Sequence, residues 1–269
     1  MRVSGSKFVG DGAGFRRFLT IFVWSVQAMS ACRRGAPRIG RYDDDTMTIR
    51  CCIFDLDGVL VDTARYHFLA WARLARGLGF EFPPACEASI RGLSRMDSLE
   101  VVLRAGGMER RFAPEERERL AAEKNAFYLE SVAAMTPAEV LPGCVEFLRS
   151  LRGRGIGLVL GSSSKNAGLV LDRTGLRPLF DDVVDGTHLT RAKPDPEVFL
   201  LGASRVGAEP AQCVVFEDAA AGIEAAHRAG MRCVGVGTGA ATAAAELRIA
   251  SFADFTPGAL AAGLDAAGA

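Results

Sequence analysis

The stretch Ile49-Arg-Cys-Cys-Ile-Phe-Asp-Leu-Asp-Gly-Val-Leu-Val-Asp62 begins with a short apolar run and turns abruptly polar at Asp55. A short apolar run of this kind is typical of a strand that is buried on both faces of a parallel sheet. Asp55 and Asp57 then follow the carboxyl end of the strand, which is where open parallel sheets bind their ligands. One carboxylate could act as a nucleophile and the other as a general acid/base.

Apolar runs alternate with helical patterns along most of the remaining chain. Strands are predicted at residues 155–160, 182–184, 213–216 and 232–236, with a weaker one at 249–252. Helices are predicted between them at residues 144–154, 167–174, 196–206 and 221–230. Alternation of this type predicts an α/β fold, a doubly wound parallel sheet with helices on both faces.

Residues 63–136 interrupt this alternation, because they contain helical patterns and no convincing strand. The patterns cover residues 66–78, 95–104 and 114–134. We therefore expect an inserted all-helical cap domain at residues 63–136, with the core domain built from residues 47–62 and 137–269.

Composition and charge exclude several classes of protein. The 269 residues include 32 Lys and Arg and 32 Asp and Glu, so the net charge is zero. A nucleic-acid binder would need a basic surplus, and a disordered chain would combine low hydrophobicity with high net charge. The seven cysteines form no CxxC pair, which favours free thiols over a zinc site or disulfide framework.

The first 46 residues differ from the rest. A short apolar run at residues 18–26 follows Arg16-Arg17, the outline of a signal peptide, but it is too short to span a bilayer. We favour a disordered extension or a start-site artefact, with translation beginning at Met47. A cytoplasmic protein with no membrane association is expected, and a monomer is the default.

Polar groups follow three further predicted strands. Ser162-Ser-Ser-Lys-Asn166 precedes a predicted helix and could form a phosphate cradle. Lys193 precedes Pro194, which holds it in a rigid loop. Glu217-Asp218 could join Asp55 around a hard cation. Separately, each group has an ordinary alternative as a serine N-cap, a surface lysine or an acidic turn. Together they describe a magnesium-bound carboxylate nucleophile with cationic support for a phosphoryl group. His188 and His227 show no partner pattern and are assigned no role.

These motifs resemble the haloacid dehalogenase superfamily of phosphotransferases: Asp55-Leu-Asp-Gly-Val-Leu-Val-Asp62, Ser164-Lys165, Lys193-Pro194 and Glu217-Asp218. Within that superfamily, the cap segments Asp62–Trp71, Arg91–Ser98 and Lys124-Asn125 resemble the β-phosphoglucomutase family. The resemblance covers roughly residues 47–240. Small departures are Met96, where relatives often have an acidic residue, and Ser163, where alanine is usual.

The resemblance implies a Rossmann-like core and a set of residue roles. Asp55 would be the nucleophile and Asp57 the general acid/base, with Mg²⁺ held by Asp55, the Asp57 carbonyl and Asp218, assisted by Glu217. The remaining residues would bind substrate or phosphate: Thr63 at the hinge, His67, Trp71, Arg95, Lys124, Ser162, Ser164, Lys165, Asn166 and Lys193. A guanidinium such as that of Arg95 matches the oxygens of a non-transferring phosphate.

The implied reaction converts β-D-glucose 1-phosphate to glucose 6-phosphate through glucose 1,6-bisphosphate, which also serves as primer. The expected partner is thus a small sugar phosphate. A second hypothesis is a magnesium-dependent sugar-phosphate phosphatase with the same core residues. A third is a non-enzymatic binding or membrane-associated protein, which the complete set Asp55, Asp57, Lys193 and Asp218 disfavours. Trp71, His67, Arg95 and Lys124 could instead be ordinary core or surface side chains.

Overall fold

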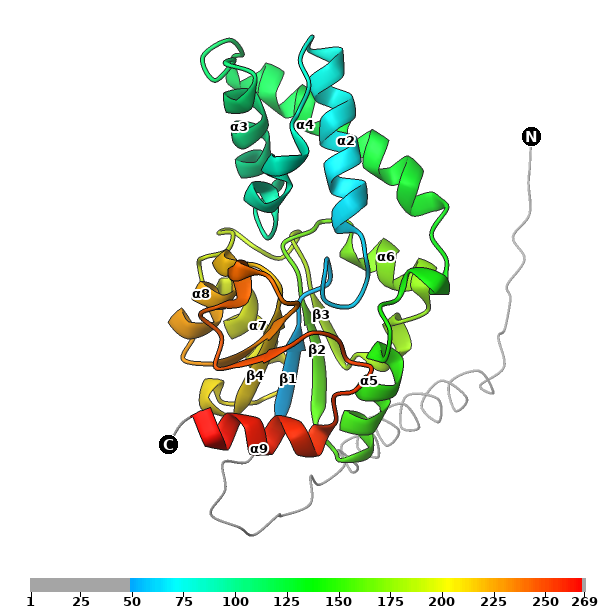
Figure 1. The fold of residues 1–269 in the computed structure, drawn as a ribbon, viewed down its shortest axis with the longest axis vertical. Helices are drawn as coiled ribbons and strands as arrows, with labels where there is room; N and C mark the ends of the chain where they lie inside the picture. Colours follow the sequence, from blue (N-terminus) through cyan, green and yellow to red (C-terminus); the bar gives the residue numbers. More distant parts are fainter. Residues whose placement is uncertain (1–48, 268–269) are drawn as a thin grey trace, which may run out of the picture. The chain divides into compact units, whose positions relative to one another are not determined.

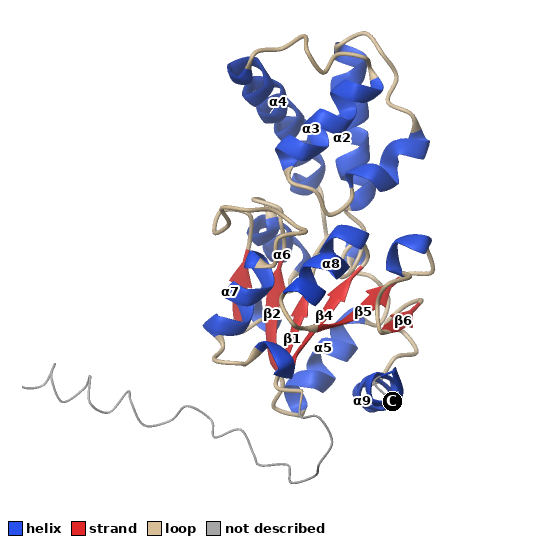
Figure 2. Ribbon diagram, turned by 90° about the vertical axis from the view of Figure 1, so that its left-hand side faces the viewer, coloured by secondary structure: helices blue, strands red, loops and turns tan. Residues whose placement is uncertain are grey.

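A six-stranded, wholly parallel sheet forms the centre of the computed structural model, which describes residues 49–267 (Figures 1 and 2). The strand order is β3-β2-β1-β4-β5-β6. The strands are β1 (Cys51–Phe54), β2 (Gly157–Gly161), β3 (Asp182–Val184), β4 (Cys213–Glu217), β5 (Arg232–Val236) and β6 (Leu247–Ile249). The expectations for residues 1–46 lie outside the described part of the chain.

Helices cover both faces of the sheet, as Figure 2 shows, so the predicted doubly wound architecture is confirmed. Alternate residues of β1 serve the two faces: Cys52 and Phe54 belong to one apolar core, and Cys51 and Ile53 to the other. The first core is covered by α5 (Cys144–Gly153), α6 (Ala167–Thr174) and α9 (Pro257–Ala267). The second is covered by α7 (Glu197–Arg205) and α8 (Ala220–Arg228).

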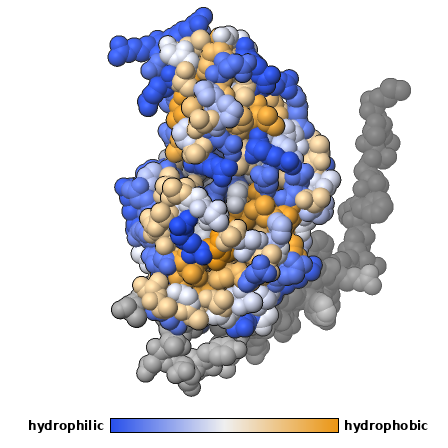
Figure 3. Space-filling model, viewed as in Figure 1, coloured by the Kyte–Doolittle hydropathy of each residue, from blue (hydrophilic) through white to orange (hydrophobic). Residues whose placement is uncertain are grey.

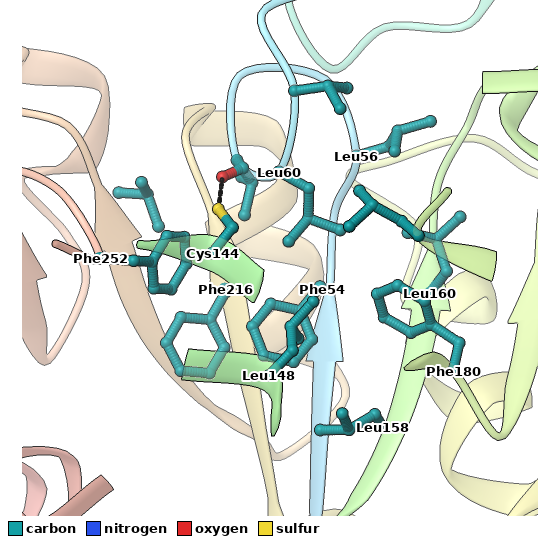
Figure 4. Close-up of a cluster of buried hydrophobic side chains, with 14 of the residues drawn as sticks. Phe54, Leu56, Leu60, Cys144, Leu148, Leu158, Leu160, Phe180, Phe216 and Phe252 are labelled. Carbon is teal, nitrogen blue, oxygen red and sulfur yellow. Dashed lines mark hydrogen bonds between the residues drawn. The ribbon is translucent and has the colours of Figure 1, made fainter. Parts of the chain in front are cut away.

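Phenylalanine rings pack together within the first core, among them those of Phe54, Phe180, Phe216 and Phe252 (Figure 4). The rings of Phe54 and Phe216, on the neighbouring strands β1 and β4, stack with their centroids 4.5 Å apart. Phe147 of α5 and Phe180 meet the Phe54 ring edge-on, with centroids 6.4 and 6.2 Å away. Phe54 is fully buried. This packing fixes β1, and therefore the loop that carries Asp55 and Asp57.

Residues 64–133 form helices that bury an apolar core of their own. The helices are α2 (Ala64–Gly77), η1 (Pro84–Ile90), α3 (Arg95–Ala105) and α4 (Pro114–Ala133). Trp71 and Leu74 of α2 pack with Leu99 and Leu103 of α3 and with Ala121 of α4. We call this group of helices the cap; its status as a separate domain stays a prediction. The short 3-10 helices are η2 (Pro137–Glu139), η3 (Arg177–Leu179), η4 (Pro210–Gln212) and η5 (Ala240–Thr242).

Two local predictions require correction, and one helix was missed. The last strand is Leu247–Ile249 rather than 249–252, because its pairing with β5 aligns Leu247 with Val234 and Ile249 with Val236. Helix α7 begins at Glu197 rather than at residue 196, and Pro196 is its N-cap. The carboxylate of Asp195, two residues before the helix, accepts a hydrogen bond from the Glu197 amide, as a capping carboxylate does. Helix α9 was not predicted in the alanine-rich tail.

Hydrophilic and hydrophobic residues are interspersed over the face of the molecule seen in Figure 3. The large apolar side chains that are exposed come from separate helices: Leu69, Met96, Leu169 and Leu200. Within residues 49–267, the helices are too short or too polar to cross a bilayer.

Substituting Phe54→Ala tests the importance of the aromatic core. The change removes a fully buried ring that packs against Phe216 and Phe147, so we expect a loss of about 3–5 kcal/mol in the free energy of unfolding. Urea unfolding followed by circular dichroism measures it. Leu69→Ala, at a side chain that is 54% exposed, is the control and should change the same quantity by less than about 0.5 kcal/mol. Equal losses in the two variants would contradict the packing described here.

Candidate active site

The loop after β1 brings Asp55 and Asp57 together. The amide of Asp57 donates a hydrogen bond of 3.0 Å to the Asp55 carboxylate, and the Thr63 hydroxyl donates to the Asp57 carboxylate. Gly58 follows with φ +83°, and a Cβ on it would lie 2.2 Å from a carboxylate oxygen of Asp218. Glycine is therefore required here both by the turn and by the close approach of Asp218 from the end of β4.

Lys193 binds two carboxylate side chains of the site, those of Asp55 and Glu217. Its ammonium donates hydrogen bonds of 2.6 Å to both Asp55 and Glu217, and its side chain is fully buried. Burial opposes the lysine's charge, but the two carboxylates outweigh that effect and raise the pKa of Lys193 above its ordinary value. Lys193 is therefore a fixed positive charge at the carboxyl ends of β1 and β4.

Burial and the charges of this cluster shift the pKa values of two other carboxyl groups, those of Asp57 and Asp218. Burial and the neighbouring charge of Asp55 raise the pKa of Asp57 to about 6, although the Thr63 hydrogen bond opposes the shift. Burial, with Glu217 and Asp55 nearby, raises the pKa of Asp218 to about 8 against the influence of Arg91. A carboxyl group with a pKa near 6 can both donate and accept a proton near neutral pH, which suits Asp57 to general acid/base chemistry.

A cavity of about 610 Å³ lies between the loop that carries Asp55 and Asp57 and the cap. Asp55 and Asp57 line it from the core, and Lys124 and Arg95 line it from α4 and the start of α3. The cavity is therefore bounded by carboxylates on one wall and by cationic side chains on another.

Lys124 is buried within the cap. Its ammonium lies 2.9 Å from Nδ1 of His67 and about 5 Å from the ring centroids of Trp71 and Tyr128. Burial, together with the charge of Arg95, lowers the pKa of Lys124 to about 7. Burial and the charge of Lys124 also lower the pKa of His67. His67 is thus neutral near pH 7 and can accept a hydrogen bond from Lys124.

A polar chain joins the cap to the core. The Arg95 guanidinium donates a 2.8 Å hydrogen bond to the side-chain oxygen of Asn125, and the same oxygen accepts a 2.8 Å hydrogen bond from the Asn166 amide group. Asn166 occupies the N-cap position of α6 and uses its side chain to contact Asn125, so a residue at the end of the serine-rich loop is tied to α4. Arg95, which lines the cavity, is thus linked to the core through Asn125.

The serine-rich loop itself is ordered by its own side chains. The Ser162 hydroxyl accepts a hydrogen bond from the Ser164 amide, and the Ser164 hydroxyl accepts one from the Asn166 amide. Ser162 is buried, whereas Lys165 is exposed at the cavity wall. The loop and the N-terminus of α6 are suited to binding an anion.

The predicted metal-binding residues divide into two groups. Asp55 and the Asp57 carbonyl follow β1, and Asp218 approaches the same turn from the end of the neighbouring strand β4; all three are oxygen donors of the kind that Mg²⁺ prefers. Both Glu217 oxygens are instead engaged, one by Lys193 and the other by the Ala219 amide. Among residues 49–267, no three carboxylate, imidazole or thiol side chains are grouped to hold a metal on their own. Mg²⁺ would thus rely on the carbonyl, on water and on phosphate oxygens as well.

Most of the predicted site residues line the cavity: Asp55, Asp57, His67, Trp71, Arg95, Lys124, Ser162, Ser164, Lys165 and Asn166. Thr63, Lys193 and Asp218 are outside its lining but contact residues that line it, namely Asp57, Asp55 and Arg91 in turn. Glu217 is also outside the lining and contacts Lys193. Their roles stay predictions.

The residues that sequence analysis missed all act through long-range contacts. Asn125 links Arg95 to Asn166, and Arg91 contacts Asp218. Both lie in segments that carry the family resemblance, which was the available signal. His188 and His227 do have partners, Asp185 and Glu246, but both pairs are on the surface and neither histidine lines the cavity.

Comparison with known proteins agrees with this geometry. A family model described as haloacid dehalogenase-like hydrolase matches residues 49–230. The chain is 40% identical over 208 residues to the β-phosphoglucomutase of Bacillus subtilis, covering 77% of this chain and 92% of that protein. It is 36% identical over 186 residues to the fructose-1-phosphate phosphatase of Escherichia coli, covering 68% of this chain and 94% of that one. The crystal structure of a β-phosphoglucomutase from Clostridium difficile matches with a TM-score of 0.78 at 36% identity, over 81% of this chain and 98% of that one.

The substitution Lys124→Met tests the burial of this lysine through the pH dependence of stability. In the unfolded chain the lysine has its ordinary pKa of about 10.4, against about 7 when folded, so between these values the unfolded state binds more protons. The free energy of unfolding of the wild type therefore increases as the pH rises from the folded to the unfolded pKa of Lys124. A methionine at this position does not titrate and contributes no such increase. We expect the stability of the variant relative to the wild type to be most favourable at about pH 7 and to decline towards pH 10.

Urea unfolding of both proteins across this pH range measures the trend. The exposed Lys165→Met is the control and should show a nearly constant difference from the wild type. A difference for Lys124→Met that is equally independent of pH would contradict the account.

Proposed function

The chain belongs to the haloacid dehalogenase-like hydrolase family, and we propose that within it the protein is a β-phosphoglucomutase, interconverting β-D-glucose 1-phosphate and glucose 6-phosphate. The observation that carries the proposal is a single cavity with Asp55 and Asp57 on the core side and Arg95 and Lys124 on the cap side. A bisphosphate needs cationic groups for the phosphate that does not react, as well as a nucleophile for the one that does.

Asp55 is the nucleophile of the proposed reaction. In the phosphorylated enzyme, Asp57 takes the proton from the 6-hydroxyl of β-glucose 1-phosphate while that oxygen attacks phosphorus and the bond to the Asp55 oxygen breaks. The product is glucose 1,6-bisphosphate, which turns in the cavity. Asp55 then attacks the phosphorus on C1, and Asp57 returns its proton to the departing sugar oxygen, releasing glucose 6-phosphate. Asp55 is then phosphorylated and Asp57 ionised, as at the start, and the proton has moved from the 6-hydroxyl to the C1 oxygen of the sugar.

The other core residues support the transferred phosphoryl group. Lys193 holds Asp55 and supplies positive charge, and Ser162 contributes a hydroxyl at the cavity wall. Mg²⁺ held by Asp55, the Asp57 carbonyl and Asp218 would offset negative charge on the phosphoryl oxygens. We assign Glu217 to positioning Lys193, since both of its oxygens are engaged by protein groups.

The cap binds the phosphate that is not transferred and excludes water. Arg95 would bind its oxygens together with Ser164, Lys165 and Asn166, and Lys124 would act beside His67 near Asp57. Trp71 supports Lys124 through its ring, and Thr63 orients Asp57 at the start of the cap. Exclusion of water matters because water would hydrolyse the phosphorylated aspartate.

A sugar-phosphate phosphatase is the second candidate, favoured by the similarity to phosphatases that include the Escherichia coli protein and a phosphorylated-carbohydrate phosphatase of Thermotoga maritima. The two functions share Asp55, Asp57 and Lys193. They differ in whether the second acceptor of the phosphoryl group is a sugar hydroxyl or water.

The two candidates are separated by measuring both products. The full chain with Mg²⁺, β-D-glucose 1-phosphate and a trace of glucose 1,6-bisphosphate should form glucose 6-phosphate with little free phosphate. Free phosphate as the main product would leave the phosphatase. The variant Asp55→Asn should form neither product, because an amide is a poor nucleophile.

Arg95→Ala tests the second phosphate site. Removing a guanidinium that binds phosphate should lower kcat/KM of the mutase reaction by roughly a hundredfold, or about 2.7 kcal/mol of transition-state stabilisation. Arg104→Ala is the matched control, since Arg104 is an exposed arginine near the other end of the same helix. An unchanged kcat/KM for Arg95→Ala would remove the second phosphate from the proposal.

A further inference from the structure

Arg91 reaches from the cap to the carboxylate of Asp218 in the core. Its guanidinium lies 3.2 Å from Oδ2 of Asp218, and it also donates a 2.7 Å hydrogen bond to Glu87 within the cap. The two acids are 131 residues apart in sequence numbering (218 − 87) and are bridged by this one side chain. Asp218 is almost fully buried, whereas Arg91 is 40% exposed and lines the cavity.

The backbone next to Arg91 is fitted against the same part of the core. Gly92 has φ +72°, and a Cβ on it would lie only 3.0 Å from the Cβ of Ala219. The left-handed conformation and the close contact both favour glycine at this position. The ion pair is thus accompanied by a backbone contact, and the Arg91-Gly92 segment is seated on the Asp218-Ala219 turn.

The oxygen that Arg91 contacts faces the nucleophile loop. Oδ2 of Asp218 is also the atom nearest to the position of a Cβ on Gly58, so it faces the turn that carries Asp55 and Asp57. A cation shared by Asp218 and Asp55 would need the same carboxylate. If both contacted this carboxylate, the guanidinium of Arg91 and a divalent cation would lie close together and repel each other strongly.

The charge of the cluster supports competition between the two cations. The ammonium of Lys193 contacts Asp55 and Glu217, and Arg91 contacts Asp218, so two cations serve a group of four carboxylates that also includes Asp57. An exposed ion pair contributes little to stability, but one partner of this pair, the side chain of Asp218, is almost fully buried.

We propose that Arg91 competes with the divalent cation for Asp218, so that seating of the Arg91-Gly92 segment and metal binding are antagonistic. This rests on the proposed function only in assigning Asp218 as a metal ligand, and it holds equally for a mutase or a phosphatase. Metal binding then releases the segment from the core. The freed guanidinium keeps Glu87 as its partner and stays at the cavity wall.

Calorimetric titration of the full-length protein with MgCl₂, without sugar phosphate, tests the proposal independently of catalysis. Arg91→Gln removes the competing charge and should bind Mg²⁺ about tenfold more tightly than the wild type. Arg91→Lys keeps the charge and should stay within about twofold of it. Arg65→Gln is the matched control: Arg65 joins the cap to Glu139, not to Asp218, and its loss should leave the affinity unchanged.

Each alternative outcome has a defined meaning. Equal or weaker Mg²⁺ binding by Arg91→Gln overturns the competition while leaving the metal site intact. Absence of Mg²⁺ binding by the wild type and every variant overturns the metal site, and the competition with it.

Hydrogen exchange of the wild type provides a second measurement that needs no variant. Mg²⁺ alone should accelerate exchange of amides in residues 91–95 relative to the metal-free protein, because the segment leaves the Asp218-Ala219 turn. Slower exchange in that segment, or no change, would overturn the proposal.

Discussion

The ammonium of Lys193 lies 2.6 Å from carboxylate oxygens of both Asp55 and Glu217, and this buried ion cluster is the constraint on which the site depends. Ionised carboxylates gathered at the ends of two adjacent strands are costly without a cation between them, because each loses hydration on burial. The parallel register of β1 and β4 brings Asp55 and Glu217 to the same edge of the sheet. Lys193 makes that juxtaposition tolerable, and it leaves Asp57 and Asp218 with raised pKa values. The chemistry of the site follows from incomplete compensation of charge rather than from any one residue.

The cap adds the opposite charge from the other side of the cavity. Lys124 is buried against Trp71 and Tyr128, and Arg95 is fixed through Asn125 to Asn166 of the core. Neither cation has a carboxylate hydrogen-bond partner within the described part of the chain. Cations without carboxylate partners beside a cavity are suited to an anionic ligand. The cap is therefore coupled to the core through the groups that would contact substrate, and the Arg91 contact extends this coupling to Asp218.

Much of the fold could be predicted because its signals are local. Apolar runs marked the central strands, and polar residues after β1, β2 and β4 marked the binding edge of the sheet. The last strand and α9 were less accessible, because register with β5 selects Leu247–Ile249 and because an alanine-rich tail carries little periodicity. The burial of Lys124 could not be derived from a charged helix pattern, since it depends on rings contributed by α2 as well as α4. The contact between Arg91 and Asp218 spans 127 positions and has no local signature.

The proposed mechanism depends above all on Asp55 accepting the phosphoryl group. The most direct test is to identify the residue that becomes covalently phosphorylated. The full-length protein is mixed with Mg²⁺ and glucose 1,6-bisphosphate, quenched in acid and digested, and its peptides are analysed by mass spectrometry. The account predicts the added mass of one phosphoryl group on Asp55 in the wild type and its absence in Asp55→Asn. A phosphoryl group on Ser162 or His67, or labelling that persists in Asp55→Asn, would contradict it.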